Sequence, residues 1–450
     1  MTAGRSASRR RRVLQAALIL TLVVPRLLLV GNGFAEPQRG LLTDSAGYLE
    51  LADSLRLEGR FHASEHEESL RTPGYPAFLA LIQTMFGEDT GFLVAAQVLL
   101  TLLTAWLLFR TARGLGGERA GLAAAGLYAL SPNALFWAGT IMSETLFAFW
   151  LTLALALLVE GLLRQAWRWS AAGGLALGLG VLTRPIGLYL APLWAAGALL
   201  AGWRLAEGRR RWAHAAALLL AALLPVLAWQ TRNLLVHDSF RLTASFRTVF
   251  VDYTAASTLG DALGISRDEA AAQLQQSPDA FAAALAVVRA YPGSLARVAL
   301  QGIARTALGT EAGTWAGILT GGGYASSGLL ESLLRGDLGG IAEALRLRLQ
   351  ASEDRLGTEL LLWGMLYSAA VSLLGLLGLL RLRWMRPGGL RWVYALVLLS
   401  VAYMIVLPLT IGDARFRVPV EPLLAVLGGM ALLARPASAD LEGARTGELG

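Results

Sequence analysis

The sequence predicts an all-α fold, a polytopic bundle of about ten and at most twelve transmembrane helices, with amphipathic helices along its outer face. Composition is the first reason: of 450 residues, 55% are hydrophobic and 16% are charged, whereas a soluble domain carries about 25% charged residues. The second reason is the length of the apolar runs, which recur along the whole chain. Each is long enough to cross a bilayer core of about 30 Å.

The distribution of charge predicts the orientation. The net charge is +7, and the sequence holds no lysine, so all 39 basic residues are arginines. Many of them stand in short clusters between apolar runs, as in the cytoplasmic loops of membrane proteins. This pattern places the N-terminus in the cytoplasm and argues against nucleic acid as a partner. Cysteine is absent, which excludes disulfides and thiolate metal sites.

The first predicted span covers residues 13–31 and follows a run of four arginines. It is longer than the apolar part of an ordinary signal peptide, so we interpret it as a retained span. Arg26 lies near its outer end, and we expect the long side chain to reach the membrane interface.

Nine more spans are predicted, at residues 91–110, 120–138, 141–163, 170–183, 186–203, 213–229, 357–380, 392–411 and 418–434. The chain is thereby divided into the N-terminus with the first span (1–31), a first periplasmic loop (32–90), a transmembrane bundle (91–229), a large periplasmic helical segment (230–356), C-terminal spans (357–434) and a cytoplasmic tail (435–450). Every arginine-rich short loop then falls on one side of the membrane.

The first outer loop contains "TDSAGYLELADSL", which places Tyr48 and Leu51 on one helical face and is followed by Gly59, a typical residue beyond a helix end. A short helix along the membrane surface is therefore predicted. The loop then turns at "RTPGYP", 71–76, where two prolines and a glycine favour a rigid bend.

The second outer segment contains two predicted helix starts. Ser266 and Glu269 form a capping box, and Ser277 is a cap followed by Pro278. Residues 294–308 form an amphipathic helix suited to the membrane interface. Its polar face carries two arginines that we expect to contact lipid headgroups, Arg297 and Arg305.

Polar residues that a bare channel wall would not need gather at the outer ends of the predicted spans. They are Asp44, Arg71, Tyr75, Glu144, Arg184, Arg232, Asn233, Arg415 and Arg417. Arginines at outer span ends oppose the usual charge bias of membrane proteins. Together these groups would form a polar cavity for a substrate with an anionic headgroup and a lipid tail, since guanidinium groups bind phosphate well.

Five motifs in order resemble the GT-C glycosyltransferases, the group that includes the aminoarabinose transferase of lipid A and the protein O-mannosyltransferases. They are "TDSAGYLELADSL…EGRF…RTPGYPAFLALI", "SPNALFWAGTIMSETLF", "GLALGLGVLTRPIGLYLAPL", "WQTRNLLVHDSFRLTAS" and "GDARFRVPVEPLL". The first motif has an acid followed four residues later by a tyrosine, here Asp44 and Tyr48. The resemblance covers the chain from about Asp44 to Leu424 and leaves residues 250–356 unmatched.

The resemblance implies an integral-membrane enzyme of the bacterial inner membrane with its active site facing the periplasm. Its donor would be a polyprenyl-phosphate-linked sugar, and its acceptor a hydroxyl on a lipid, glycan or protein. Asp44 would be the general base, and Glu144 would assist it or orient the acceptor. The arginines, with Tyr48, Tyr75 and Asn233, would bind substrate, and direct displacement would invert the anomeric centre.

Other interpretations stay open. Asp44 precedes a predicted helix and could be its N-cap. Arg184 suits a phosphate contact and a structural salt bridge equally well. Asp44, Glu144 and Asp413 could share a divalent ion, although we expect no metal or other cofactor, and His62 with His66 is better explained as a solvated loop. A transporter of lipid-linked sugars is the alternative function, but it should show midplane charges and paired broken helices.

Overall fold

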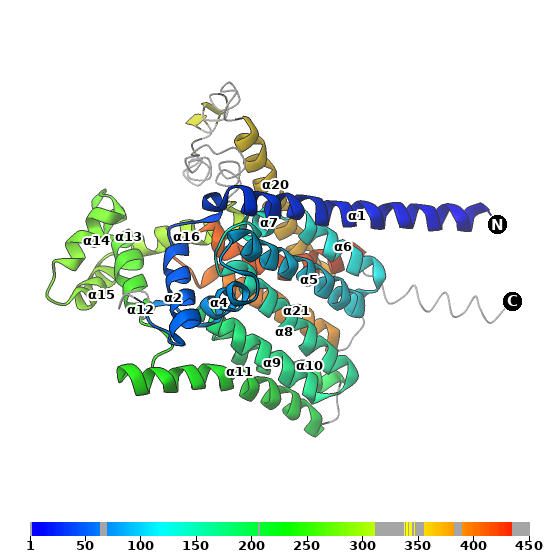
Figure 1. Ribbon diagram of the computed structural model, residues 1–450, viewed down its shortest axis with the longest axis horizontal. Coiled ribbons are helices and arrows are strands. Elements are labelled where there is room, and N and C mark those ends of the chain that lie inside the picture. Colours follow the sequence, from blue (N-terminus) through cyan, green and yellow to red (C-terminus); the bar gives the residue numbers. More distant parts are fainter. Residues whose placement is uncertain are drawn as a thin grey trace.

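The computed structural model describes residues 2–63, 70–205, 208–310, 355–381 and 389–433, with isolated positions between 337 and 346. Every regular element in these residues is a helix (Figure 1). The elements of the first half are α1 (Thr2–Ala35), η1 (Pro37–Gly40), α2 (Ser45–Glu58), α4 (Gly74–Phe86), α5 (Thr90–Gly116), α6 (Glu118–Ala129), α7 (Pro132–Ala138), α8 (Glu144–Arg164), α9 (Trp167–Thr183), η2 (Pro185–Gly187), α10 (Leu190–Leu205) and α11 (Gly208–His237).

The second half begins with a group of short helices and ends with three helices of the bundle. They are α12 (Ser245–Thr248), η3 (Val249–Ala255), α13 (Ala256–Leu263), α14 (Arg267–Gln275), α15 (Ala280–Ala290), α16 (Pro292–Leu308), α20 (Arg355–Arg381), α21 (Gly389–Val406), η5 (Ala414–Val420) and α22 (Glu421–Leu433). The elements α2, α4 and α12 to α16 lie at one end of the bundle, opposite the start of α1 (Figure 1).

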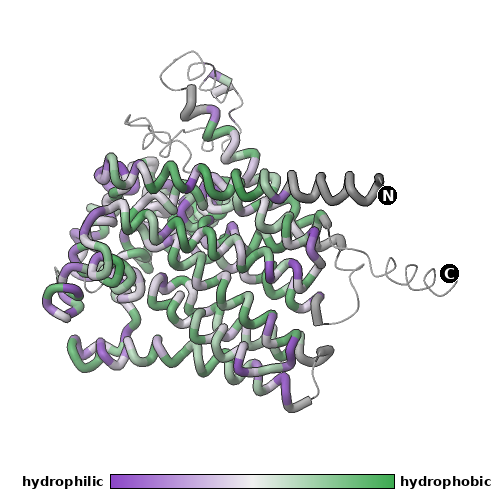
Figure 2. Tube along the Cα trace, turned by 45° about the vertical axis from the view of Figure 1, so that its right-hand side comes forward, coloured by the Kyte–Doolittle hydropathy of each residue, from purple (hydrophilic) through white to green (hydrophobic). Residues whose placement is uncertain are grey.

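Five helices of the described residues are long and apolar enough to cross a membrane, namely α1, α5, α8, α11 and α20, and the bent pair α15–α16 would make a sixth. The chain is therefore a multi-pass membrane protein, as its sequence predicts. Apolar residues fill the middle of the bundle and hydrophilic residues gather toward its ends (Figure 2). The remaining predicted spans correspond to helices of at most 18 residues, among them α9, α10, α21 and α22.

The predicted span 120–138 is two helices, α6 and α7. The break lies at Ser131, whose Oγ accepts a hydrogen bond from the backbone N–H of Ala134, and Pro132 occupies the first position of α7. A serine cap followed by proline starts a new helix, because proline lacks the N–H that would continue the previous one. Residues 414–420 likewise form the 3-10 helix η5 ahead of α22, so the last predicted span is shorter than expected.

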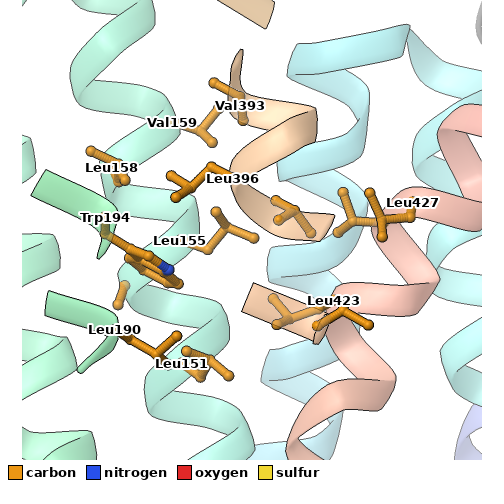
Figure 3. Packing of buried hydrophobic residues seen from close by; sticks show 14 of the residues in the cluster. Leu151, Leu155, Leu158, Val159, Leu190, Trp194, Val393, Leu396, Leu423 and Leu427 are labelled. Atoms are coloured by element: carbon orange, nitrogen blue, oxygen red, sulfur yellow. The ribbon is translucent and has the colours of Figure 1, made fainter. Parts of the chain in front are cut away.

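The main core packs α8 against α10, α21 and α22. Leu155, Trp194, Leu396 and Leu427 are all nearly or completely buried there (Figure 3). The indole N–H of Trp194 donates to Ser400 Oγ at 2.8 Å. The indole is therefore satisfied inside the bundle, as a buried Trp requires.

Arg26 does not extend to the membrane interface as the sequence suggested. Its side chain is fully buried, and its Nε donates to Thr101 Oγ1 at 2.8 Å while Nη1 donates to the carbonyl of Leu22 at 2.8 Å. The neighbouring face of α5 supplies a polar partner, which makes burial inside the bundle possible for a charged residue. Arg26 thereby joins α1 to α5.

Arg417 and Glu421 form a second buried polar centre. Both side chains are completely buried, and Arg417 Nε lies 2.6 Å from Glu421 Oε1. The guanidinium group also donates to the carbonyl groups of Ala307 and Ser368. These contacts tie η5 and α22 to α16 and α20.

The α12–α16 unit has its own small apolar core, which includes Val251, Ala270 and Ala284. The predicted helix start at Ser266 is confirmed, since its Oγ accepts from the backbone N–H of Glu269. The second predicted start is wrong by two residues: Asp279, not Ser277, caps α15.

Arg297, expected at lipid headgroups, instead pairs with Asp261 at 2.7 Å. The two residues lie on α16 and α13, so the pair holds two helices of the α12–α16 unit together. A carboxylate on the neighbouring helix therefore replaces the lipid phosphate as the partner of this guanidinium group.

The α12–α16 unit rests on the segment between α21 and η5. A side chain at Gly302 would overlap the carbonyl oxygen of Leu409, and Leu409 itself has a φ of 41°, which is uncommon for a residue other than glycine. The hydroxyl of Thr410 donates to Thr254 Oγ1 at 2.9 Å. This contact fixes the segment that leads directly into Arg415.

Gly302→Ala should destabilise the folded protein by about 1–3 kcal/mol, because the new methyl group has no room against the backbone of Leu409. Gly293→Ala is the matched control in the same helix, since the nearest atom to its new Cβ would be Arg297 Nη1 at 3.9 Å. Thermal unfolding of the purified protein measures both. Equal effects of the two substitutions would contradict the close packing inferred here.

Candidate active site

Two helix starts of the bundle carry polar residues whose side chains do not cap their helices. Asp44 precedes α2 and Ser143 precedes α8, and neither side chain accepts a hydrogen bond from the helix backbone. Asp and Ser at this position normally do so. Both side chains make other contacts instead, so the capping interpretation of Asp44 is wrong.

The start of α2 is attached to the loop between α7 and α8. The backbone N–H of Ile141 donates to the carbonyl of Gly40 at 2.9 Å, and Ser45 Oγ donates to the carbonyl of Ile141 at 2.9 Å. A Cβ at Gly40 would lie only 2.8 Å from the carbonyl oxygen of Gly139, so the two loops need glycine to meet. This contact brings the residue before α2 beside the residue before α8.

The turn at 71–76 is attached to the end of α9. A Cβ at Gly74 would lie 2.7 Å from the carbonyl oxygen of Leu182, and Thr72 Oγ1 lies 3.4 Å from that of Thr183. Arg184 follows directly with an extended backbone, as expected before Pro185 because proline disfavours helix at the preceding residue. Its side chain is therefore outside the helix and turns toward α8.

Seven residues from five segments of the chain come together here, and we call them the Asp44 cluster. The cluster consists of Asp44, Tyr48, Arg71, Ser143, Glu144, Arg184 and Arg415.

Asp44 is held by two arginines, one on each oxygen. Arg71 Nη2 donates to Oδ1 at 3.2 Å, and Arg415 Nη1 donates to Oδ2 at 3.0 Å. Arg415 is positioned by the start of η5, where Asp413 Oδ1 accepts its backbone N–H at 2.8 Å. Asp44 remains 35% exposed, so its carboxylate is open to solvent while both guanidinium groups are largely covered.

A chain of polar contacts runs from Asp44 into the bundle. The Arg71 guanidinium lies 4.4 Å from the ring centre of Tyr48, a cation–π distance. The Tyr48 hydroxyl is 3.2 Å from Ser143 Oγ, which also accepts from Arg184 Nη1 at 3.0 Å. The same Nη1 forms an ion pair with Glu144.

Glu144 is completely buried, and one of its oxygens, Oε2, has no hydrogen-bond partner. It occupies the first position of α8, where the helix dipole favours a negative charge. A buried carboxylate with a cationic partner is well suited to hold Arg184 in place.

Burial alone would raise the pKa of the Asp44 carboxyl, but Arg71 and Arg415 outweigh this effect and hold its pKa below the ordinary value. Burial alone would lower the pKa of the Arg415 guanidinium. The carboxylates of Glu144, Asp413 and Asp44 outweigh it and raise that pKa instead. Asp44 and Arg415 are therefore both ionised near neutral pH.

Two of the predicted site residues, Tyr75 and Arg417, are buried and bonded to other groups of the protein. Tyr75 is completely buried, and its hydroxyl donates to Gln97 Oε1 at 3.0 Å; Gln97 in turn donates to the carbonyl of Thr140 at 2.6 Å. Arg417 is buried in its pair with Glu421. We therefore do not assign these two side chains to substrate binding.

Arg232 and Asn233 lie elsewhere. Arg232 donates to the carbonyl of Phe61 at 3.0 Å and lies over the ring of Trp229, while Asn233 donates to the carbonyl of Arg241. Phe61 follows the C-terminal end of α2, and Asp44 precedes its N-terminal end. The 14 residues of α2 extend about 21 Å. Asp44 and Arg232 therefore lie near opposite ends of this helix, although the sequence analysis placed them in one site.

Sequence reasoning missed Ser143, which connects Tyr48 to Arg184. Ser143 resembles an ordinary helix cap in sequence, and only the direction of its side chain reveals the connection. Among the described residues, no three His, Asp or Glu side chains are grouped as metal ligands; His66 lies outside those residues.

Comparison with known proteins supports the predicted fold. Residues 70–229, a little over a third of the chain, match the family described as dolichyl-phosphate-mannose-protein mannosyltransferase. A search of curated protein sequences gave no match.

Among solved structures, the chain is similar to the oligosaccharyltransferase of Archaeoglobus fulgidus in the apo form, with a TM-score of 0.51 and 15% identity over 96% of this chain. The archaeal oligosaccharyltransferase AglB with an inhibitory peptide and a dolichol-phosphate gives the same TM-score and identity over 97%. The chain covers 52% of each of these proteins. ArnT from Cupriavidus metallidurans bound to undecaprenyl phosphate gives a TM-score of 0.42 at 16% identity, covering 96% of this chain and 81% of ArnT. The two matches to the archaeal oligosaccharyltransferase confirm the predicted fold.

The Asp44 ion pairs should make stability depend on pH in a specific direction. Because the folded-state pKa of Asp44 is lowered, its contribution is present above the ordinary carboxyl pKa of about 4 and is lost as the pH falls through the folded-state value. The difference in unfolding temperature between the natural protein and Asp44→Asn should therefore disappear in acid. A difference independent of pH would contradict the ion pairing.

Proposed function

We propose that the protein is a membrane glycosyltransferase that moves a sugar from a polyprenyl-phosphate-linked donor to an acceptor hydroxyl. The observation that carries this proposal is a partly exposed carboxylate held between two guanidinium groups at one end of a transmembrane bundle with the GT-C fold. A fold neighbour is described in complex with a dolichol-phosphate, and the matched family is described by a dolichyl-phosphate sugar donor.

Asp44 is the general base in this proposal. The acceptor oxygen attacks the anomeric carbon while its proton passes to the Asp44 carboxylate. The bond between that carbon and the phosphate oxygen breaks, and its electron pair leaves with the polyprenyl phosphate. Attack and departure occur on opposite faces of the sugar, so the configuration of the anomeric carbon inverts.

Arg71 and Arg415 stabilise the phosphate as it gains negative charge. Guanidinium groups form strong charge-assisted hydrogen bonds with phosphate oxygens, and charge that develops in the transition state gains most from donors that are already in place. Glu144 is a positioning residue, since its buried carboxylate holds Arg184. Tyr48 supports the guanidinium plane of Arg71.

The proposed location is the bacterial inner membrane, with the N-terminus in the cytoplasm and the Asp44 cluster facing the periplasm. The start of α1 lies at one end of the bundle, and α2, which follows Asp44 and carries Tyr48, lies at the other (Figure 1). With the arginine-rich head in the cytoplasm, this arrangement puts Asp44 on the outer side. The lipid tail of the donor then stays in the bilayer during the reaction.

Asp44→Asn should lower the rate of sugar transfer by about 10²- to 10⁴-fold, because an amide cannot accept the proton. The measurement is release of polyprenyl phosphate by purified protein from a panel of polyprenyl-phosphate sugars. Asp261→Asn is the control, since Asp261 is also paired with an arginine but lies in the α12–α16 unit. Full activity of Asp44→Asn would exclude Asp44 as the general base. Translocation of the lipid-linked sugar without its cleavage would favour a transporter.

Arg71→Gln should weaken binding of polyprenyl phosphate by about ten- to a hundredfold, the loss of one hydrogen bond between charged groups. Arg232→Gln should change it little, because its contacts are with Phe61 and Trp229. Calorimetric titration in detergent compares the two variants. A larger loss of polyprenyl phosphate binding in Arg232→Gln than in Arg71→Gln would contradict the proposed phosphate site.

A further inference from the structure

The charges of the Asp44 cluster and the adjoining Asp413 balance before any substrate binds. Three arginines, Arg71, Arg184 and Arg415, stand against three carboxylates, those of Asp44, Glu144 and Asp413. A donor phosphodiester adds one negative charge to this group. These six residues hold no surplus cation for it, so the phosphate must share a guanidinium group with a carboxylate.

Asp44 is the carboxylate that can release its arginines most easily. Glu144 is completely buried, and a buried carboxylate that loses its cation is strongly destabilised. Asp413 is bound by the backbone N–H of Arg415 and caps η5. Asp44 makes no cap and is 35% exposed, so water can replace a lost guanidinium contact.

Resting on the proposed function, we propose that Arg71 and Arg415 are shared counterions that pass from Asp44 to the donor phosphate as the sugar is transferred. In the resting site each guanidinium group occupies one oxygen of Asp44. Arg415 Nε is buried without a hydrogen-bond partner, so this guanidinium group has a donor that its resting contacts do not use. The partner that the two arginines bind then depends on whether Asp44 is protonated.

The charge accounting of the reaction fits this exchange. Before transfer, Asp44 and the phosphodiester carry one negative charge each. Afterwards the acceptor proton is on Asp44, which is neutral, and the released phosphate monoester carries nearly two negative charges. The total is unchanged, but the negative charge has moved from the carboxylate to the phosphate, and the arginines follow it at little electrostatic cost.

The same contacts explain why Asp44 is restrained before the donor arrives. The two guanidinium groups lower its pKa, and a carboxylate with a lowered pKa is a weaker base. The other titratable groups that face it belong to α2, α8, the end of α9 and η5, and are Tyr48, Glu144, Arg184 and Asp413. Removal of the arginines by phosphate should strengthen the base only when a donor is present.

A simpler interpretation is that the arginines only orient Asp44 and stay on it throughout. The two interpretations differ in whether the response of Asp44 to phosphate requires the arginines. If the arginines move, binding of a phosphate monoester makes Asp44 easier to protonate partly because Asp44 loses these cations. If they stay, only the negative charge of the phosphate makes Asp44 easier to protonate, and that response does not require Arg71.

The test is infrared titration of the purified protein with and without saturating polyprenyl phosphate. The carbonyl band of protonated Asp44 is identified as the signal that Asp44→Asn lacks. We expect polyprenyl phosphate to increase the proton affinity of Asp44 about tenfold, which is one pH unit in the titration midpoint. The band of Asp261, paired with Arg297 outside the cluster, is identified with Asp261→Asn and should not move.

Two variants separate the interpretations further. In Arg71→Gln the resting midpoint of Asp44 should already be higher and should respond less to phosphate, whereas Arg71→Lys should restore part of the response because the charge is kept. An equal rise of the midpoint in Arg71→Gln and in the natural protein, or an unchanged or lower midpoint with polyprenyl phosphate bound, would overturn the exchange and leave the proposed enzyme intact. Absence of any polyprenyl phosphate binding would overturn both proposals.

Discussion

The ion pairing of Asp44 is the interaction on which the organisation of this site depends. Its two partners are 27 and 371 residues away in the sequence, so the pairing requires that the first loop and the last connection of the bundle meet. The remaining contacts at this end of the bundle bring the first loop and the last connection together. A partly exposed carboxylate with two cations is also a chemically versatile arrangement, because either side can exchange its partner for substrate.

Close backbone contacts create the required proximity. The loops at Gly40 and Gly74 approach neighbouring carbonyl groups at distances that a side chain would not allow, and Gly302 does the same beneath the segment leading to Arg415. Loops held in this way lose less conformational freedom when substrate binds than mobile ones would. The bundle below these loops, with its packed core around Trp194, gives them a rigid support.

Two classes of arginine thus occur in one protein. Arg26 and Arg417 are fully buried and contact groups on neighbouring helices, so they connect helices within the bundle. Arg71 and Arg415 keep part of their surface open and contact a carboxylate that water also reaches. The first class stabilises the fold, and the second is the one we propose to bind phosphate. The sequence does not separate the two classes, because burial and partners depend on packing.

The sequence by itself determined the membrane class, most of the helices and the family resemblance, because hydropathy, arginine clusters and short motifs are local properties. The cap of α15 at Asp279 and the break of span 120–138 at Ser131 and Pro132 are also local signals, which the sequence analysis missed. The sequence could not decide that the side chains of Asp44 and Ser143 do not cap their helices, because their partners come from distant segments. The tertiary structure alone decided that Arg415 reaches Asp44 while Arg417, two residues later, faces Glu421, and that Arg232 lies by the far end of α2. Such assignments depend on the direction of each side chain after packing, and sequence distance carries no information about that direction.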